Sequence, residues 1–237
     1  MSRYDLFSVK LAVFLQLIQF GVFFLAALPF ILAKLMKAPL LESVNLTVDT
    51  FYVFVIVSQI AGAIISYLIV HKRMKLNGLT WQSLGFRSFR YGRAVRYIAG
   101  YYILMLGGLF VIAAIVNSNG WVGESSNSVS SNSTIDSVLG FWPLILTTVI
   151  LGPLIEEIVS RGILFKSLNM KYGLIASSVM AGTLFAVMHI NPIQAMMVLP
   201  LGIYLCVMYD RLGSIVPGII LHATWNLLVV FISVRAI

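Results

Sequence analysis

The stretch Leu151-Gly-Pro-Leu-Ile-Glu156-Glu157-Ile-Val-Ser-Arg161-Gly-Ile-Leu-Phe-Lys-Ser-Leu168 decides how the rest of the chain has to fold. It continues an apolar run that is long enough to enter a bilayer, and it places two adjacent carboxylates and a guanidinium within that run. An ionised carboxylate in hydrocarbon is costly unless it has a partner or water. The stretch therefore predicts either a polar site inside the membrane or a pair of Glu157 with Arg161 that anchors a helix at the lipid interface.

The composition is that of a polytopic membrane protein. Of 237 residues, 60% are hydrophobic and 10% are charged, whereas charged residues make up about 25% of an ordinary soluble domain. The net charge of +8 does not indicate nucleic-acid binding, because the basic residues gather in short segments between apolar runs, where orientation in the membrane explains them. The single cysteine, Cys206, excludes an intrachain disulfide and a cysteine-based metal site.

The apolar segments predict an all-α fold, a single membrane-embedded domain over residues 1–237 with about seven transmembrane helices. Each segment is near the roughly 20 residues that a helix needs to cross hydrocarbon. The expected helices cover residues 11–33, 51–70, 97–116, 139–165, 174–190, 195–209 and 213–234.

The charges of the loops predict the orientation. The loop between the second and third segments holds seven Lys and Arg residues and no acid, whereas residues 123–134 are rich in Ser and Asn and hold no basic residue. Lys and Arg accumulate on the cytoplasmic side, so the basic loop and the amino terminus are expected there, in a multi-pass protein of the cell membrane. Residues 76–86 mix apolar and polar side chains and suit the headgroup region.

Few strongly polar side chains occur in the apolar segments, and they come from three separate segments. Apart from amides such as Gln16, Gln19 and Gln59, they are Glu156, Glu157, Arg161, His189, His222 and Asn226. At about 1.5 Å per residue from the nearest basic flank, Glu156 and His222 lie near the bilayer midplane, and His189 lies deeper. Each also has a simpler interpretation, with His189 meeting carbonyls at a helix end and His222 and Asn226 joining packed helices.

Pro153 predicts a kink one turn before the carboxylates. Proline removes the backbone hydrogen bond to the carbonyl of Val149, and exposed backbone at membrane depth is tolerated where it lines protein or water. The kink therefore favours a wet cavity beside Glu156 and Glu157.

Together, the polar side chains have the composition of a hydrolytic site. A carboxylate and an imidazole that share a water can remove its proton and make it a nucleophile towards a carbonyl. Arg161 lies one turn after Glu157, which favours Glu157 as the ion-paired support and Glu156 as the base. His222 and Asn226, one turn apart, can donate hydrogen bonds to an oxyanion. Alternatively, a zinc ion can be bound with a water, by Glu156, Glu157, His189 and His222, although the sequence has no His-Glu-x-x-His.

Three short motifs, taken in order, resemble the CPBP family of intramembrane proteases, also called the Abi or CAAX amino-terminal protease family, which includes the type II CAAX prenyl endopeptidases. The motifs are Glu-Glu-x-x-x-Arg at Glu156, Glu157 and Arg161, Phe-x-x-x-His at Phe185 and His189, and His-x-x-x-Asn at His222 and Asn226. The resemblance covers about residues 142–234, and residues 139–234 are expected to carry the catalytic core.

The resemblance implies an all-helical membrane fold and an enzyme that hydrolyses peptide bonds of membrane-associated peptides or proteins. It implies that Glu156 activates water together with His189, that His222 and Asn226 hold the oxyanion, and that Glu157 and Arg161 support the site. Members have been described both as metalloproteases and as metal-independent glutamate proteases. We favour the metal-independent scheme, without a cofactor, because Asn is a poor metal ligand and a good oxyanion donor.

The short chain and simple basic loop resemble the bacterial branch, whose members are linked to bacteriocin self-immunity, peptide maturation or signalling, and imply a bacterial plasma membrane. Two other functions stay open: a non-catalytic immunity or peptide-binding protein of the same fold, and a transporter or proton relay. The missing repeat symmetry argues against the transporter. The expected partners are a membrane peptide or protein substrate and the lipid bilayer, with no nucleic acid.

Overall fold

The computed structural model describes residues 9–36, 48–118, 142, 145–189 and 192–235. Within these ranges all regular secondary structure is helical and no strand occurs, so the all-α prediction is confirmed for them. The elements are α1 (Val9–Met36), α3 (Val48–Leu76), the short 3₁₀ helix η1 (Trp81–Leu84), α4 (Tyr91–Ser118), η2 (Leu146–Leu151), α6 (Gly152–Glu157), η3 (Ile158–Phe165), α7 (Lys166–Val187), α8 (Pro192–Leu212) and α9 (Val216–Arg235).

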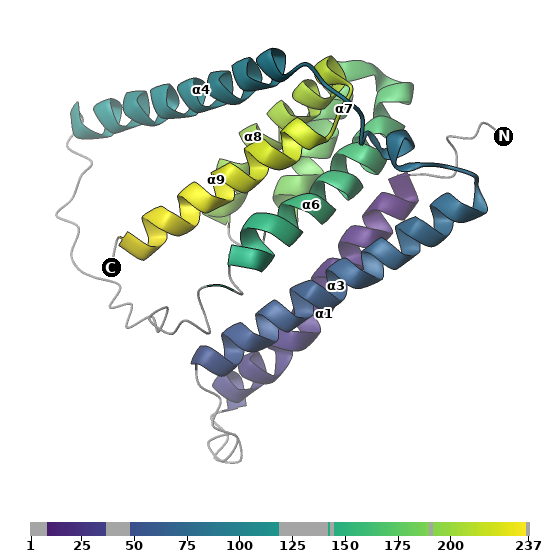
Figure 1. Ribbon diagram of the computed structural model, residues 1–237. Coiled ribbons are helices and arrows are strands. Elements are labelled where there is room, and N and C mark those ends of the chain that lie inside the picture. The colour runs from purple at the N-terminus through teal and green to yellow at the C-terminus, as the bar shows by residue number, and fades with distance from the viewer. Residues whose placement is uncertain (1–8, 37–47, 119–141, 143–144, 190–191, 236–237) are drawn as a thin grey trace.

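The continuous stretch η2–α6–η3 lies in the middle of the bundle (Figure 1). On one side of it α1 and α3 pair with each other, and on the other side α7, α8 and α9 pack together. Helix α4 lies at the edge, where it contacts α8 and α9. The sequence segment with the two carboxylates is therefore surrounded by helices from both halves of the chain.

Five of the helices, α1, α3, α4, α7 and α8, are longer than the apolar segments that predict them. Helix α3 continues to Leu76 and α4 begins at Tyr91, because Lys and Arg favour a helix but do not count as apolar. Helix α7 is interrupted at Gly173, whose φ of 74° is a conformation that glycine adopts without strain. By length and composition, two described helices can cross a membrane, over Tyr91–Val111 and Gln194–Leu212. Seven crossings and a cytoplasmic amino terminus stay predictions.

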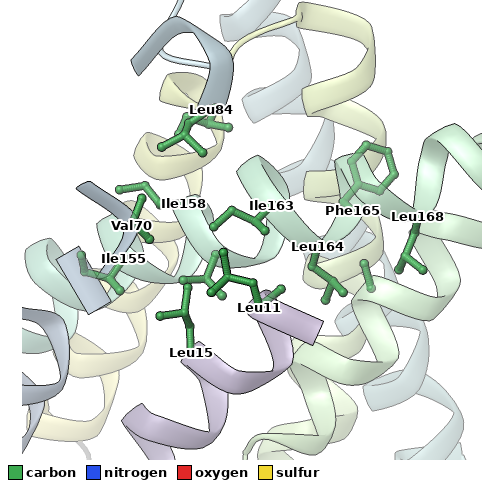
Figure 2. Close-up of a cluster of buried hydrophobic side chains, with 14 of the residues drawn as sticks. Leu11, Leu15, Val70, Leu84, Ile155, Ile158, Ile163, Leu164, Phe165 and Leu168 are labelled. Carbon is green, nitrogen blue, oxygen red and sulfur yellow. The ribbon is translucent and has the colours of Figure 1, made fainter. Parts of the chain in front are cut away.

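Figure 2 shows the apolar core that surrounds η3. Ile163 and Leu164 are fully buried, together with Leu15 of α1 and Leu84 of η1. Gly162 makes the approach of η1 possible, since a methyl group at this position would lie 2.8 Å from the carbonyl oxygen of Leu84. Burial of these side chains fixes η3, and with it the carboxylates that precede it, inside the bundle.

The basic loop after α3 is docked onto the bundle at η1. Lys166 Nζ donates to the carbonyl of Ser83 at 2.8 Å, and Ser214 Oγ donates to the carbonyl of Arg87 at 2.8 Å. Burial lowers the pKa of Lys166, and the positive charge of Arg87 lowers that pKa further. This loop therefore joins the start of α7 to the start of α9.

Two glycines set the distance between α7 and α8. A methyl group on Gly182 would lie 2.6 Å from Ile203 Cγ1 and 2.9 Å from the Ile203 backbone nitrogen, and one on Gly202 would lie 3.1 Å from Gly182 Cα. Small residues let membrane helices approach this closely. The contact brings the Phe185 ring of α7 close to Gly202 of α8, since a methyl group on Gly202 would lie 3.2 Å from Phe185 Cδ1.

Gly182→Ala is expected to destabilise the protein by about 1–3 kcal/mol, because the added methyl group meets backbone that cannot yield cheaply. The measurement is the apparent Tm of the purified protein in detergent. Gly107→Ala on α4 is the matched control, since nothing lies within 4 Å of its added methyl group. An equal Tm for the two variants would contradict the close approach of α7 and α8.

Candidate active site

The two adjacent carboxylates point to different environments. Successive residues of a helix are turned by about 100°, so Glu156 and Glu157 cannot share one face. The Glu156 side chain is 37% exposed and faces a cavity, whereas Glu157 is fully buried beneath it. The structure therefore has one accessible carboxylate, that of Glu156, and one inner carboxylate, that of Glu157.

Arg161 forms a buried ion pair with Glu157. Arg161 Nη1 donates to Glu157 Oε1 at 2.8 Å, and both side chains are 1% exposed. Its Nη2 donates to the carbonyl of Gly202 at 3.1 Å, and its Cζ lies 4.6 Å from the centroid of the Phe185 ring. The pair of Glu157 with Arg161 thus lies in the interior of the bundle and not at its exposed surface.

His222 of α9 connects the two carboxylates. Its Nδ1 lies 3.1 Å from Glu157 Oε1, and its Nε2 lies 3.7 Å from Glu156 Oε2. An ionised carboxylate only accepts hydrogen bonds, so Nδ1 is the protonated nitrogen when it bonds Glu157. Glu157 therefore orients the imidazole so that Nε2 is turned to Glu156.

His189 follows the end of α7 and lies on the other side of Phe185. Its Nδ1 is 3.0 Å from the carbonyl of Phe185, as expected for a histidine that meets carbonyls at a helix end. The Phe185 ring packs against both imidazoles, with centroid distances of 5.2 Å to His189 and 5.6 Å to His222. The Phe-x-x-x-His motif therefore places one aromatic ring between the two histidines.

The turn η2, which precedes Pro153, is a π-helix. The Gly152 N–H bonds the carbonyl of Thr147, five residues back, as in a π-helix. Pro153, the next residue, has no backbone N–H, and the loss of the hydrogen bond to the carbonyl of Val149 stays a prediction. Asn226 Nδ2 of α9 donates to the carbonyl of Thr148 in η2 at 2.8 Å.

A cavity of about 990 Å³ brings the predicted site residues together. Its lining includes Glu156, His189, His222 and Asn226, while the pair of Glu157 with Arg161 supports it from within the bundle. All six polar residues of the three motifs are thus gathered into one region, from α6, η3, the residues that follow α7, and α9.

The far wall of the cavity comes from the first half of the chain, which carries no recognisable motif. Gln16 and Gln19 of α1 and Ser58 and Gln59 of α3 line it, and Gln16 Nε2 donates to Ser160 Oγ at 3.4 Å. From the sequence, the glutamines are expected only as amides within apolar segments, with no predicted role. The sequence feature that indicates a shared position for two of them is the spacing of Gln16 and Gln19, because residues three apart lie on the same face of a helix.

The donor set does not fit the alternative metal site. In the ranges that the structure covers, no three His, Cys, Asp or Glu side chains converge closely enough to hold a metal ion. Glu157 Oε1 is already bound by a guanidinium and an imidazole, and His189 Nδ1 faces a backbone carbonyl. The reaction proposed below therefore uses no metal ion.

Comparison with known proteins gives a match to the segment that contains this site. Residues 138–228 match the family described as type II CAAX prenyl endopeptidase Rce1-like, and no curated protein or solved structure gives a significant match. The family is one of membrane-embedded proteases, and together with the apolar helices it supports a membrane protein and a protease. Residues 138–228 are therefore similar to the Rce1-like type II CAAX prenyl endopeptidases, consistent with the resemblance of the three motifs to the CPBP family.

Proposed function

We propose that this protein is an intramembrane endopeptidase that hydrolyses a peptide bond of a membrane-associated peptide or protein. The observation that carries the proposal is the gathering of Glu156, His189, His222 and Asn226 on one cavity, within the segment that matches a protease family. The buried pair of Glu157 with Arg161 gives this cavity a rigid base.

In the proposed reaction Glu156 is the general base, assisted by His189. The accessible carboxylate takes a proton from a water that His189 orients, and the water oxygen attacks the carbonyl carbon of the substrate. The carbon–nitrogen bond then breaks, and the proton held by Glu156 passes to the leaving nitrogen. One carboxylate thus serves as base and then as acid.

His222 and Asn226 are proposed to stabilise the oxyanion. The Asn226 amide carries two hydrogens, and one is used by the carbonyl of Thr148, so the second is left for the substrate. Glu157 holds His222 Nδ1, so an imidazolium at this position would donate through Nε2 on the Glu156 side. Removing one such donor typically costs about 10²–10³ in kcat.

The wall of glutamines is proposed to bind the main chain of the substrate. A peptide segment in a membrane needs a partner for every N–H and carbonyl group, and a carboxamide both donates and accepts. Gln16, Gln19 and Gln59 face the cavity shared with Glu156. They are therefore suited to hold an extended peptide across the site.

The function is tested with the purified protein in liposomes, incubated with a library of membrane peptides and analysed by mass spectrometry. We expect cleavage at defined bonds that a chelator leaves unchanged. Loss of cleavage on chelation, with recovery on adding zinc, would overturn the metal-independent mechanism. Retention of peptides without any cleavage would instead favour the peptide-binding alternative.

A further inference from the structure

A second hollow lies at the edge of the bundle, between α4 and α8. It has a volume of about 610 Å³ and is lined by Arg93, Arg96 and Tyr97 of α4 and by Tyr204 and Arg211 of α8. None of these residues lines the cavity of the candidate active site. The hollow is therefore separate from the candidate active site.

The hollow concentrates positive charge that the described part of the chain does not neutralise. Guanidinium groups stay protonated at any pH that a protein experiences. Among the described residues, no carboxylate forms a salt bridge with Arg93, Arg96 or Arg211. Asp210, next to Arg211 in the sequence, instead accepts a hydrogen bond from Asn169 of α7 at 2.9 Å. Three like charges around one hollow favour an anion from outside the protein.

The position of the hollow indicates where this anion comes from. It lies at the amino-terminal end of α4 and the carboxyl-terminal end of α8, and within the described residues both helices have a segment long and apolar enough to cross a membrane. Tyr97 and Tyr204 line it, and Tyr204 Oη donates to the carbonyl of Tyr97 at 2.7 Å. Tyrosine and arginine side chains collect at the level of lipid headgroups.

An apolar surface continues from the hollow along α4. Ile103, Leu104 and Phe110 are 71%, 66% and 76% exposed. Ile103 follows Arg96 by seven residues, so it lies about 10 Å deeper along the helix axis. An anion whose phosphate group lies in the hollow could thus place acyl chains on this apolar surface. A free phosphate ion has no apolar part to contact it, so the surface favours a phospholipid.

We propose that this hollow binds the phosphate group of an anionic phospholipid, with its acyl chains along the exposed face of α4. The guanidinium groups bind phosphate through charge-assisted hydrogen bonds. The bound lipid joins α4 to α8, and α4 in turn contacts α9, where Tyr102 Oη donates to Thr224 Oγ1 at 2.9 Å. The lipid therefore stabilises the outer helix against the helices of the candidate active site.

The test is native mass spectrometry of the delipidated full-length protein in detergent, titrated with phosphatidylglycerol or phosphatidylcholine. In the variant Arg93→Gln, Arg96→Gln and Arg211→Gln, we expect the affinity for phosphatidylglycerol to fall by about tenfold to a hundredfold. The matched control, Lys72→Gln, Arg73→Gln and Lys75→Gln at the end of α3, removes the same charge from exposed positions and should bind as the original protein does.

Several outcomes overturn the proposal: equal binding of both lipids by the original protein, undiminished binding by the arginine variant, or equal losses in both variants. A rise in apparent Tm with inorganic phosphate but not with phosphatidylglycerol would also overturn it, since the anion would then be a soluble one. Should the triple variant not fold, Arg96→Gln alone must still weaken binding of phosphatidylglycerol measurably.

Discussion

Glu156→Gln is expected to lower the rate of peptide cleavage by at least about a hundredfold, because an amide cannot take the proton of the attacking water and general base catalysis contributes about 10²–10⁴. The substitution preserves the shape of the side chain. Glu156 faces the cavity, and the buried pair of Glu157 with Arg161 does not depend on it. The protein should therefore keep its apparent Tm. The measurement is the initial rate of cleavage in liposomes at matched protein content.

The matched control for this variant is Asp210→Asn, which removes one carboxylate charge from an exposed position on α8 outside the cavity. Its cleavage rate is expected to equal that of the original protein. If Glu156→Gln cleaves as fast as this control, the assignment of the general base is wrong. Loss of activity in both variants would instead indicate an effect of net charge.

The largest effect on stability is expected from the pair of Glu157 with Arg161. Glu157→Leu leaves a guanidinium that is 1% exposed without its carboxylate, and breaking a buried ion pair in this way costs about 3–5 kcal/mol. Arg161 would retain the carbonyl of Gly202 and the face of Phe185, and neither of these carries a negative charge. The expected result is a large fall in the apparent Tm, measured in detergent with the lipid content held constant.

The double variant Glu157→Leu and Arg161→Met separates loss of the pair from loss of packing. Removing both charges takes away the unpaired guanidinium, so the double variant is expected to be more stable than Glu157→Leu alone. His222 also loses the acceptor for Nδ1 in both variants, so this loss cancels in the comparison. Purely additive destabilisation would show that the two residues do not act as a pair.

Much of the fold was predictable, because the hydropathy of a segment directly indicates whether it is buried in lipid or in the protein core. Every predicted apolar segment overlaps a described helix, and the order of the three motifs identified the site residues that the cavity brings together. Local signals also placed Glu157 and Arg161 as a pair, since residues four apart meet on any helix. Helix ends were less predictable, because charged residues prolong a helix without adding hydropathy.

Other features could not be predicted, because they depend on contacts between distant segments. The hydrogen bond from Asn226 of α9 to the carbonyl of Thr148 depends on how α9 packs against η2. The placement of Gln16 and Gln59 opposite Glu156 likewise depends on how α1 and α3 pack. The spacing of Gln16 and Gln19 indicates that they share a face of α1, but not which helices that face contacts.

By itself, the sequence determined the helical class, the membrane-like composition and the six polar residues of the motifs, because each is a property of composition or of neighbours along one helix. Only the tertiary structure decided that Glu156 faces a cavity while Glu157 is buried, that the glutamines form the opposite wall, and that three arginines from two helices share a hollow. The physical reason is that the packing of the helices determines which face of each helix is buried, and this packing depends on the shapes of all the helices together.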